Sequence, residues 1–453
     1  AKPRKTTLFR KEINGITYRI PALIYISETQ TFLAFAEKRA SPCDHDAILL
    51  VMRRGTQQDG CIQWSPVQEL STACLPGHRT MNPCPVYEKE TKTLFLFFIC
   101  VLGKTSEHHQ IHTGKNKARL CYVTSSDNGQ SWTSTIDLTE SVIGHEIRNW
   151  ATFAVGPGHG IQMKSGRLII PAYVYYIHCR CFPFHFPLWV TSHAFAFYSD
   201  DCGVTWQFGE RVSSESCECE MAEIVDQESR SELYCNARSS KGHRVEVLSK
   251  SSGAAFDRPH VARKLVEPSH GCQGSVVSFS APEDYCLAQY TKTWLLYSHP
   301  TDRRSRKALG VYLNKSPLSI SDCRVESLSE TSGKAFGAPQ YPRNLVETGT
   351  GCQGSVLSIA VPSEQKSTSD TENWLLFSHP TDRGMRMNLG VYLNKSPLSG
   401  SGWSEPWVIH HGPSGYSDLS ICEQPDRFAC LMECGKKSEL EEIAFVEFSL
   451  SDL

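Results

Sequence analysis

The chain has 453 residues, of which 40% are hydrophobic and 21% are charged. This composition excludes a disordered or fibrous protein and supplies enough apolar side chains for a sizeable core. The 46 Lys and Arg residues against 48 Asp and Glu give a formal charge of −2. We therefore expect no nucleic-acid partner, because such proteins need a basic field.

Short apolar runs rich in Val, Ile, Phe and Tyr follow one another along the chain, with Gly, Asn, Asp, Ser and Pro between them. Representative runs are residues 47–54, 94–102, 167–176 and 442–448. Their length and the turn residues that separate them predict an all-β fold whose sheets pack on one another or radially. The run at 94–102 is about half as long as a membrane-spanning helix requires, so no transmembrane helix is expected.

Two stretches share the template S-x-D-x-G-x-[S/T]-W, at residues 125–132 and 199–206. The Asp and Ser/Thr side chains can satisfy backbone groups of a turn, Gly permits a positive φ, and Trp can fasten the hairpin to the sheet behind it. Weaker echoes follow at 249–256 and 329–336, where Phe replaces Trp. The repetition predicts a blade-like structural unit, and we assign these boxes a structural role.

A second repeat has a constant offset of 80 residues. Residues 271–278 return at 351–358, residues 294–303 at 374–383, and residues 309–319 at 389–399. We interpret this as a tandem duplication of units 244–319 and 324–399, each long enough for a four-stranded blade and a loop. Both units are predicted to lie within one domain that spans residues 1–453.

Nineteen cysteines are present, an odd number without a CxxC pair. Their spacing predicts no disulfide scaffold and favours a reduced, intracellular-facing protein. The first residues lack the continuous apolar core of a secretory signal, so we do not expect secretion.

The tetrapeptide YRIP at 18–21 and the pentapeptide GYSDL at 415–419 accompany the two boxes. With these motifs the sequence resembles the sialidases (exo-α-neuraminidases) of vertebrates, above all their plasma-membrane, ganglioside-cleaving members. The resemblance covers nearly the whole chain, including residues 32–41, 77–86, 150–162 and 170–176. It implies a six-bladed β-propeller that hydrolyses terminal α-linked sialic acids on gangliosides, oligosaccharides and glycoproteins without a cofactor or metal. It also implies a peripheral membrane or cytoplasmic location.

A sialic acid carries a carboxylate on its anomeric carbon, and the forked donors of arginine suit such a planar anion. The resemblance assigns Arg19 and Arg238 to this clamp. The third arginine is either Arg306 or Arg386, because the duplication supplies two candidates. Arg386 is favoured since it lies 30 residues before Tyr416, whereas Arg306 keeps the family-like distance from Arg238.

The same carboxylate repels an anionic nucleophile, and sialidases use a neutral tyrosine in place of a second carboxylate. The resemblance assigns this role to Tyr416, which needs a base because a phenol ionises only near pH 10. Glu218 matches the residue that takes its proton, with Glu220 and Glu223 as sequence neighbours.

The leaving sugar needs a general acid. Asp44 matches the family's loop aspartate, and Asp46 is its rival. Other positions match residues that brace the clamp or line the sugar pocket. These are Glu37 for the brace and Arg39, Met81, Asn82, Glu107, Tyr173, Tyr175, and either Gln353 or its twin Gln273 for the pocket.

The aromatic segment 175–197 is either packed between blades or forms a protruding loop whose Phe184, Phe186 and Trp189 enter a bilayer interface.

The extra 80-residue unit forms a seventh blade or is extruded from the ring, and we favour extrusion. A widened ring would misplace catalytic groups, so a catalytically impaired sialic-acid-binding propeller is the alternative function. A lectin-like propeller would need the clamp without Tyr416, Glu218 and Asp44, and all three are present. No motif supports a scaffold propeller. Oligomeric state and linkage preference are not predicted.

Overall fold

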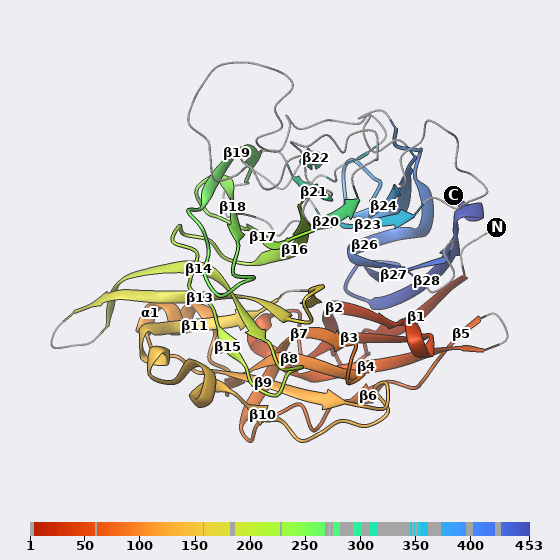
Figure 1. Ribbon diagram of the computed structural model, residues 1–453. Coiled ribbons are helices and arrows are strands. Elements are labelled where there is room, and N and C mark those ends of the chain that lie inside the picture. The colour runs from red at the N-terminus through yellow and green to blue at the C-terminus, as the bar shows by residue number, and fades with distance from the viewer. Residues whose placement is uncertain are drawn as a thin grey trace, which may run out of the picture. The chain divides into compact units, whose positions relative to one another are not determined.

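The computed structural model describes residues 4–58, 61–156, 158–181, 186–226, 229–267, 271, 275–280, 293–300, 309–314, 345–346, 348, 352, 354–360, 373–395, 402–421 and 427–453 (Figure 1). These residues are mostly in antiparallel β-strands, which confirms the all-β prediction.

Contacts between residues divide the chain into two compact units. The N-terminal unit comprises Thr7–Cys219 and Leu440–Ile443, and the C-terminal unit comprises Ala1–Thr6, Glu220–Glu439 and Ala444–Leu453. Each unit has its own clusters of buried apolar side chains, so each is held together by hydrophobic burial within its own sheets.

Three antiparallel sheets make up the N-terminal unit. The first sheet holds β2 (Thr17–Ile26), β3 (Thr31–Arg39), β4 (Ala47–Gln58), β5 (Cys61–Trp64) and β6 (Gln68–Glu69). The second holds β7 (His78–Glu88), β8 (Thr93–Leu102), β9 (Ala118–Ser125) and β10 (Ile136–Asp137). The third holds β11 (Trp150–Val155), β12 (Ile161–Gln162), β13 (Leu168–Arg180), β14 (Pro187–Ser199) and β15 (Gln207–Phe208). Most strands pair with their neighbours in the chain, so each sheet is an up-and-down meander. The apolar runs at 47–54, 94–102 and 167–176 form β4, β8 and β13, as expected.

The C-terminal unit contains two smaller sheets and one of seven strands. One smaller sheet holds β16 (Cys219–Val225), β17 (Ser231–Ala237), β18 (His243–Ser249) and β19 (His260–Val266). The other holds β20 (Ser275–Ser280), β21 (Thr293–Pro300) and β22 (Leu309–Asn314). The large sheet has the order β1 (Arg4–Arg10), β28 (Glu442–Ser449), β27 (Arg427–Cys434), β26 (Trp407–Ile421), β25 (Met387–Asn394), β24 (Asn373–Pro380) and β23 (Ser355–Ala360). Residues 407–413 of β26 pair with β25 and residues 414–421 pair with β27, so this long strand joins two four-stranded groups.

The two copies of the repeat form the same strands with the same register. Ser275 pairs with Ser298 in the first copy, and Ser355 pairs with Ser378 in the second. The first copy forms a sheet of its own, and its strand β20 contacts β23 of the second copy. The strands of the two copies therefore lie side by side in the C-terminal unit. The echo at 329–336 and the loop at 364–372 lie outside the described residues.

Helical structure is confined to short segments. They are α1 (Glu107–Thr113), the π-helical turn η3 (Thr139–Ile143), and the 3-10 turns η1 (Ser27–Thr29), η2 (Asp44–Asp46), η4 (Gly144–Asn149) and η8 (Leu450–Asp452). Helix α1 was not predicted from the sequence, because two turns are too short to show a periodic pattern. In the described part of the chain, no helix has the length and apolar character needed to traverse a bilayer. The cysteines described there form no disulfide bonds with one another.

Both boxes form the same hydrogen-bonded turn, which in each case precedes the last strand of the sheet in chain order. In the second box, Asp201 accepts hydrogen bonds from the hydroxyl of Ser199 (2.8 Å), the backbone N–H of Thr205 (2.8 Å) and the hydroxyl of Thr205 (2.6 Å). The bonds of Asp127 in the first box match these within 0.1 Å. In the echo at 249–256, the hydroxyl of Ser251 accepts from the backbone N–H of Ala255 (2.8 Å) and so takes the place of the carboxylate.

The tryptophan of each box packs on the preceding sheet. The ring of Trp206 meets Phe97 of β8 edge-on at 4.6 Å between centroids, and Trp132 meets Phe35 of β3 at 6.0 Å. Gly203 of the second box leaves no room for a side chain, since an added Cβ would lie 2.1 Å from the ring of Phe95. The boxes therefore fasten successive sheets to one another, as their structural assignment predicted.

The carboxylate of Asp201 gives this turn a predictable pH dependence. Its hydrogen bonds to Thr205 and Ser199 lower its pKa below the ordinary value of 3.8. The stability that it contributes is therefore present above pH 3.8 and is lost as the pH falls through its lower pKa in the folded protein. Asp201→Asn is expected to lower the free energy of unfolding by roughly 1–2 kcal/mol near neutral pH, and by less below pH 3.8.

Urea unfolding of the wild type and the variant at both pH values measures this difference. Asp200→Asn is the matched control, because Asp200 forms only an exposed ion pair with Arg167 (2.6 Å), which is worth at most about 1 kcal/mol. A deficit for Asp201→Asn that grows as the pH falls would contradict the assigned role.

Candidate active site

In the N-terminal unit, Glu37 is the centre of a buried polar cluster. It lies on β3 directly opposite Arg19 of β2. Its fully buried carboxylate accepts hydrogen bonds from Nε of Arg39 (2.7 Å) and from the backbone N–H of Asn82 (2.8 Å). Burial raises the pKa of Glu37, and the positive charge of Arg39 opposes that effect. The structure thus brings Arg19, Glu37, Arg39 and Asn82 together.

The buried guanidinium of Arg39 also reaches the loop that carries the candidate general acid. Its Nη1 donates to Oδ1 of Asp44 (2.6 Å) and to the backbone oxygen of Pro42 (3.0 Å). The side chain of Asp44 is nevertheless 79% exposed. The rival Asp46 is held by the hydroxyl of Ser41 (2.7 Å) and by Lys104 (3.2 Å), and these contacts lower its pKa. Asp44 is thus the more exposed of the two carboxylates, since the side chain of Asp46 is 20% exposed.

Breaks in the strand ladder occur where the candidate residues lie. The register shifts between Arg19 and Ala22, between Met81 and Cys84, and between Ser414 and Ser417. Ile20 and Asn82 in the first two breaks have positive φ angles of 57° and 60°. A positive φ is strained for a β-branched residue, and such bulges redirect side chains out of the regular alternation of a strand.

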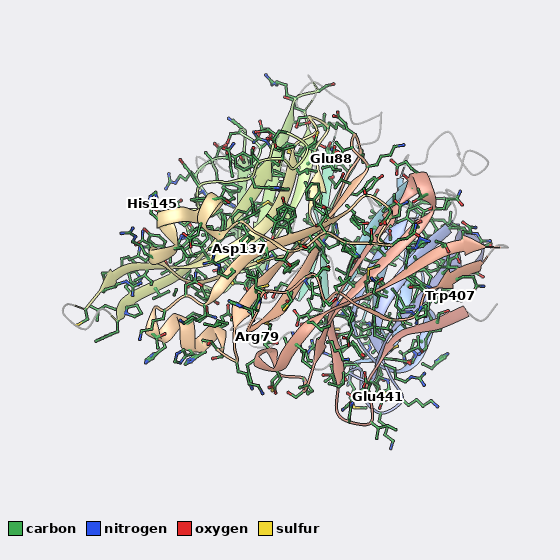
Figure 2. All side chains as sticks on the ribbon, turned by 90° about the horizontal axis from the view of Figure 1, so that it is seen from below. Arg79, Glu88, Asp137, His145, Trp407 and Glu441 are labelled. Carbon is green, nitrogen blue, oxygen red and sulfur yellow. The ribbon has the colours of Figure 1, made fainter. Side chains whose placement is uncertain are left out.

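Arg79 holds the segment that leads to helix α1. Its buried guanidinium on β7 (Figure 2) donates to the backbone oxygens of Gly103 (2.8 Å) and Thr105 (2.7 Å). Burial lowers its pKa, while the negative charges of Glu37 and Asp44 raise it. Sequence reasoning did not single out Arg79, although it lies two residues before Met81, which is buried.

Tyr173 lies beside the other candidates for the glycerol and acyl side of the sugar pocket. Its ring meets that of Tyr175 edge-on at 6.2 Å. Burial raises the pKa of Tyr173 strongly, and the nearby charges of Glu107 and Glu218 raise it further. The hydroxyl of Tyr175 lies 3.9 Å from the sulfur of Cys217. Tyr173, Tyr175, Glu107 and Glu218 are therefore neighbours in the N-terminal unit.

The alternatives to Glu218 belong to the C-terminal unit. The carboxylate of Glu220 accepts a hydrogen bond from the backbone N–H of Val276 (2.7 Å) on β20, within the first repeat copy. Because this bond ties Glu220 to the repeat, its carboxylate serves the packing of β16 against β20. Glu218, in contrast, lies near Tyr173 in the N-terminal unit.

In the C-terminal unit, Tyr416 lies half-buried on β26 beside Arg386. The guanidinium carbon of Arg386 lies 5.8 Å from the centre of the Tyr416 ring. The backbone oxygen of Arg386 accepts from the N–H of Ser414 (2.9 Å), which fixes the two segments against each other. On the other side, the buried Glu433 contacts the backbone N–H of Tyr416 (3.4 Å). Gly415 lets this carboxylate approach closely, because an added Cβ would lie 2.8 Å from it.

Arg238 follows β17 and is framed by a buried ion pair. Arg244 and Glu267 lie 2.9 Å apart and are both inaccessible to solvent. Nε of Arg244 donates to the side chain of Asn236 (2.7 Å), and Glu267 accepts from the backbone N–H of Ser239 (3.1 Å). The pair thus fixes the backbone on both sides of Arg238. Sequence reasoning missed it, because the two residues are 23 positions apart and belong to no motif.

Removal of this pairing has an expected cost. Glu267→Gln leaves the buried charge of Arg244 uncompensated, and we expect the free energy of unfolding to fall by about 2–3 kcal/mol. Because the segment around Arg238 loosens, KM for a soluble sialoside is expected to rise more than kcat falls. The double variant Arg244→Met/Glu267→Met is the control: it is expected to recover most of the stability while KM stays high. Unchanged KM in both variants would remove the positioning role.

Three candidates lie outside the described residues, namely Arg306, Gln273 and Gln353. Among the described residues, one group of three could supply metal ligands, formed by Glu88, Glu90 and Cys202. The carboxylate of Glu88 already accepts from Thr91 (2.6 Å) and Gln162 (2.8 Å), which gives it a structural role in the β7–β8 turn.

Residues 30–321 match the family described as a BNR repeat-like domain. Human Sialidase-3 is 46% identical over 444 residues, which cover 98% of this chain and 91% of that relative. Mouse Sialidase-4 is 43% identical over 458 residues, which cover 100% of this chain and 94% of that relative. Among solved structures, the intramolecular trans-sialidase from Ruminococcus gnavus has a TM-score of 0.58 at 13% identity, over 99% of this chain and 98% of that chain.

Proposed function

Because this chain belongs to the sialidase family and is a glycoside hydrolase with the predicted β-propeller fold, we propose that it removes terminal sialic acids from glycolipids through a tyrosine nucleophile. The proposal concerns the preferred substrate and the mechanism, and the activity as an exo-sialidase is its premise.

The contact between Arg386 and Tyr416 carries the proposal. A cation near a phenol favours the phenolate, which is the nucleophilic form. The same guanidinium is a suitable partner for the substrate carboxylate. A half-buried tyrosine at a break in its strand, with an arginine 5.8 Å from its ring, is a better candidate than a tyrosine in the regular ladder.

The proposed reaction has two displacements. Arg19, Arg238 and Arg386 bind the carboxylate, and the oxygen of Tyr416 attacks the anomeric carbon while Glu218 takes the phenolic proton. Asp44 donates a proton to the departing glycosidic oxygen. Water then attacks the glycosyl-enzyme bond, Asp44 accepts its proton, and Tyr416 regains its own. Two inversions retain the configuration.

The supporting pockets have roles that follow from their chemistry. Glu37 and Arg39 fix the Arg19 strand and the Asp44 loop, and Asn82 suits the N-acyl group. Tyr173, Tyr175 and Glu107 offer an aromatic and polar wall for the glycerol chain. Met81 adds an apolar contact, and Gln353 or Gln273 is a further pocket residue.

The stereochemistry of the first product tests the mechanism. Proton NMR during hydrolysis of a soluble α-sialoside is expected to show the α-anomer of free sialic acid first, followed by slow mutarotation. Initial release of the β-anomer would refute a covalent tyrosine intermediate. The substrate class is tested by comparing kcat/KM on a detergent-dispersed sialylated glycolipid and on sialyllactose, and a higher value on the sugar alone would refute the glycolipid preference. No observation on the described residues favours the catalytically impaired alternative.

A further inference from the structure

The β13–β14 hairpin carries three large apolar side chains into solvent. Phe186, Leu188 and Trp189 are 46%, 61% and 57% exposed, and they are close in sequence at one end of the hairpin. The hairpin extends beyond the strands that it pairs with and passes α1 (Figure 1). Exposed aromatic and aliphatic residues gathered at a tip are typical of a surface that meets another apolar phase.

The tip is held in place from below. Nη2 of Arg180 donates to the backbone oxygens of Gly114 (3.2 Å) and Arg148 (2.9 Å), which lie after α1 and on η4. Pro187 pairs with Arg180 in register, and an added Cβ on Gly114 would lie 3.0 Å from its ring. The base of the tip is thus clamped to the segments that carry Lys115 and Arg148.

The ring of Trp189 is also positioned by a neighbour. It stacks on the ring of His178 across the hairpin, with 4.2 Å between centroids and 24° between planes. An exposed tryptophan held in one orientation loses little side-chain entropy when it enters an interface. Tryptophan is the residue that most favours the boundary between lipid headgroups and acyl chains.

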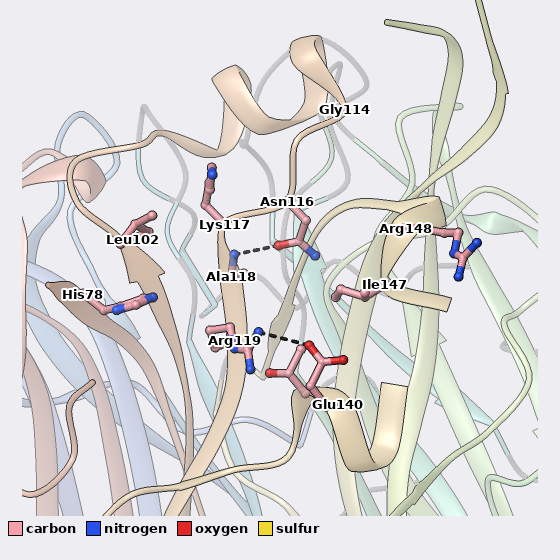
Figure 3. A pocket seen from close by; sticks show the side chains of 11 residues that line it. His78, Leu102, Gly114, Asn116, Lys117, Ala118, Arg119, Glu140, Ile147 and Arg148 are labelled. Carbon is pink, nitrogen blue, oxygen red and sulfur yellow. Dashed lines mark hydrogen bonds and ion pairs between the residues drawn. The ribbon is translucent and has the colours of Figure 1, made fainter. Parts of the chain in front are cut away.

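Cations surround the clamp. Lys115, Lys117 and Arg148 are exposed, and no described carboxylate lies within ion-pair distance of them. Lys117 and Arg148 line a cavity of about 430 Å³ together with His78 and Arg119 (Figure 3). The nearby carboxylates have partners of their own, since Asp137 and Glu140 bind Arg119. Glu146 lies 3.7 Å from His145.

We propose that this face binds an anionic lipid bilayer. Phe186, Leu188 and Trp189 enter the boundary between headgroups and acyl chains, and Lys115, Lys117 and Arg148 bind headgroup phosphates. An apolar tip beside unpaired cations is complementary to a surface that is apolar below a layer of negative charge. Phe184, named with Phe186 and Trp189 at the outset, lies outside the described residues.

Vesicle flotation tests the proposal independently of the active site, because the vesicles contain no sialic acid. One set is pure phosphatidylcholine, and the other also contains phosphatidylserine at about one part in four. The wild type is expected to bind the anionic vesicles more tightly than the pure phosphatidylcholine vesicles. Each of the three cations is expected to contribute a factor of about five to this difference in affinity. Phe186→Ser/Leu188→Ser/Trp189→Ser is expected to bind both vesicles at least about tenfold more weakly.

Charge is tested by Lys115→Gln/Lys117→Gln/Arg148→Gln, which is expected to abolish the preference for anionic vesicles. Matched controls are Val204→Ser, an exposed apolar residue in the second box, and Lys89→Gln/Lys92→Gln on the β7–β8 turn, and both should float like the wild type. All variants should hydrolyse a soluble sialoside at the wild-type rate, which shows that they fold. Equal binding to both vesicles, wild-type flotation of the tip variant, or no flotation at all would overturn the proposal.

Discussion

Tyr416→Phe is expected to lower kcat on a soluble fluorogenic sialoside by at least about a thousandfold, because the variant has no oxygen to form the glycosyl-enzyme bond. The substitution keeps the ring, so its contact with Arg386 and the packing of β26 remain. Affinity for a sialic-acid analogue is therefore expected to change little. Steady-state kinetics and calorimetric binding of the analogue measure the two quantities.

Two controls separate loss of the nucleophile from loss of structure. The melting temperature of Tyr416→Phe should stay close to that of the wild type. Tyr87→Phe, on β7 of the N-terminal unit and partly buried, removes a phenol of similar exposure and should leave kcat unchanged. If Tyr416→Phe turns over substrate at the wild-type rate, the nucleophile assignment is wrong.

The part of the fold that could be predicted from the sequence depends on short-range bonds. Ser199, Asp201, Gly203, Thr205 and Trp206 satisfy one another within eight residues. A template of this kind is visible in the sequence because all of its partners are local. The 80-residue repeat was visible because its two copies have nearly the same sequence. The strands that they form have equal registers.

Features that depend on distant partners were not visible. The positive φ of Ile20 lies at the break in register between β2 and β3, and the tetrapeptide YRIP does not indicate that break. The buried pair of Arg244 and Glu267 likewise looks like two ordinary charged residues in the sequence. Burial of a charge is decided by tertiary packing, and a single sequence does not carry that information.

The candidate site shows the same division. Motif positions such as Tyr416 and Asp44 could be named in advance, because the motifs around them resemble those of the sialidases. The sequence favoured Asp44 with Asp46 as its rival, but it did not show that Ser41 and Lys104 hold Asp46. The bond from Val276 to Glu220 is likewise a long-range contact that the sequence does not show.

The duplication leaves one functional question, which is the copy that supplies the third arginine. Arg386 lies beside Tyr416 in the C-terminal unit, and it can bind the carboxylate with a planar fork of donors. Arg386→Ala is therefore expected to lower kcat/KM about a thousandfold, mainly through KM, because both the bound substrate and the transition state lose this contact. Arg386→Lys should recover only part of the loss, since a lysine keeps the charge but not the fork.

Arg306→Ala distinguishes the two copies and is expected to keep kcat/KM within about threefold of the wild type. Arg383→Ala is the matched control, because Arg383 is exposed on the same turn as Arg386 and differs from it in lacking the contact with Tyr416. A large loss in Arg306→Ala with normal kinetics in Arg386→Ala would transfer the third arginine to the first copy. Since the strands of the two copies have the same register, such a result would mean that the position of a blade, and not its sequence, decides which arginine meets the sugar.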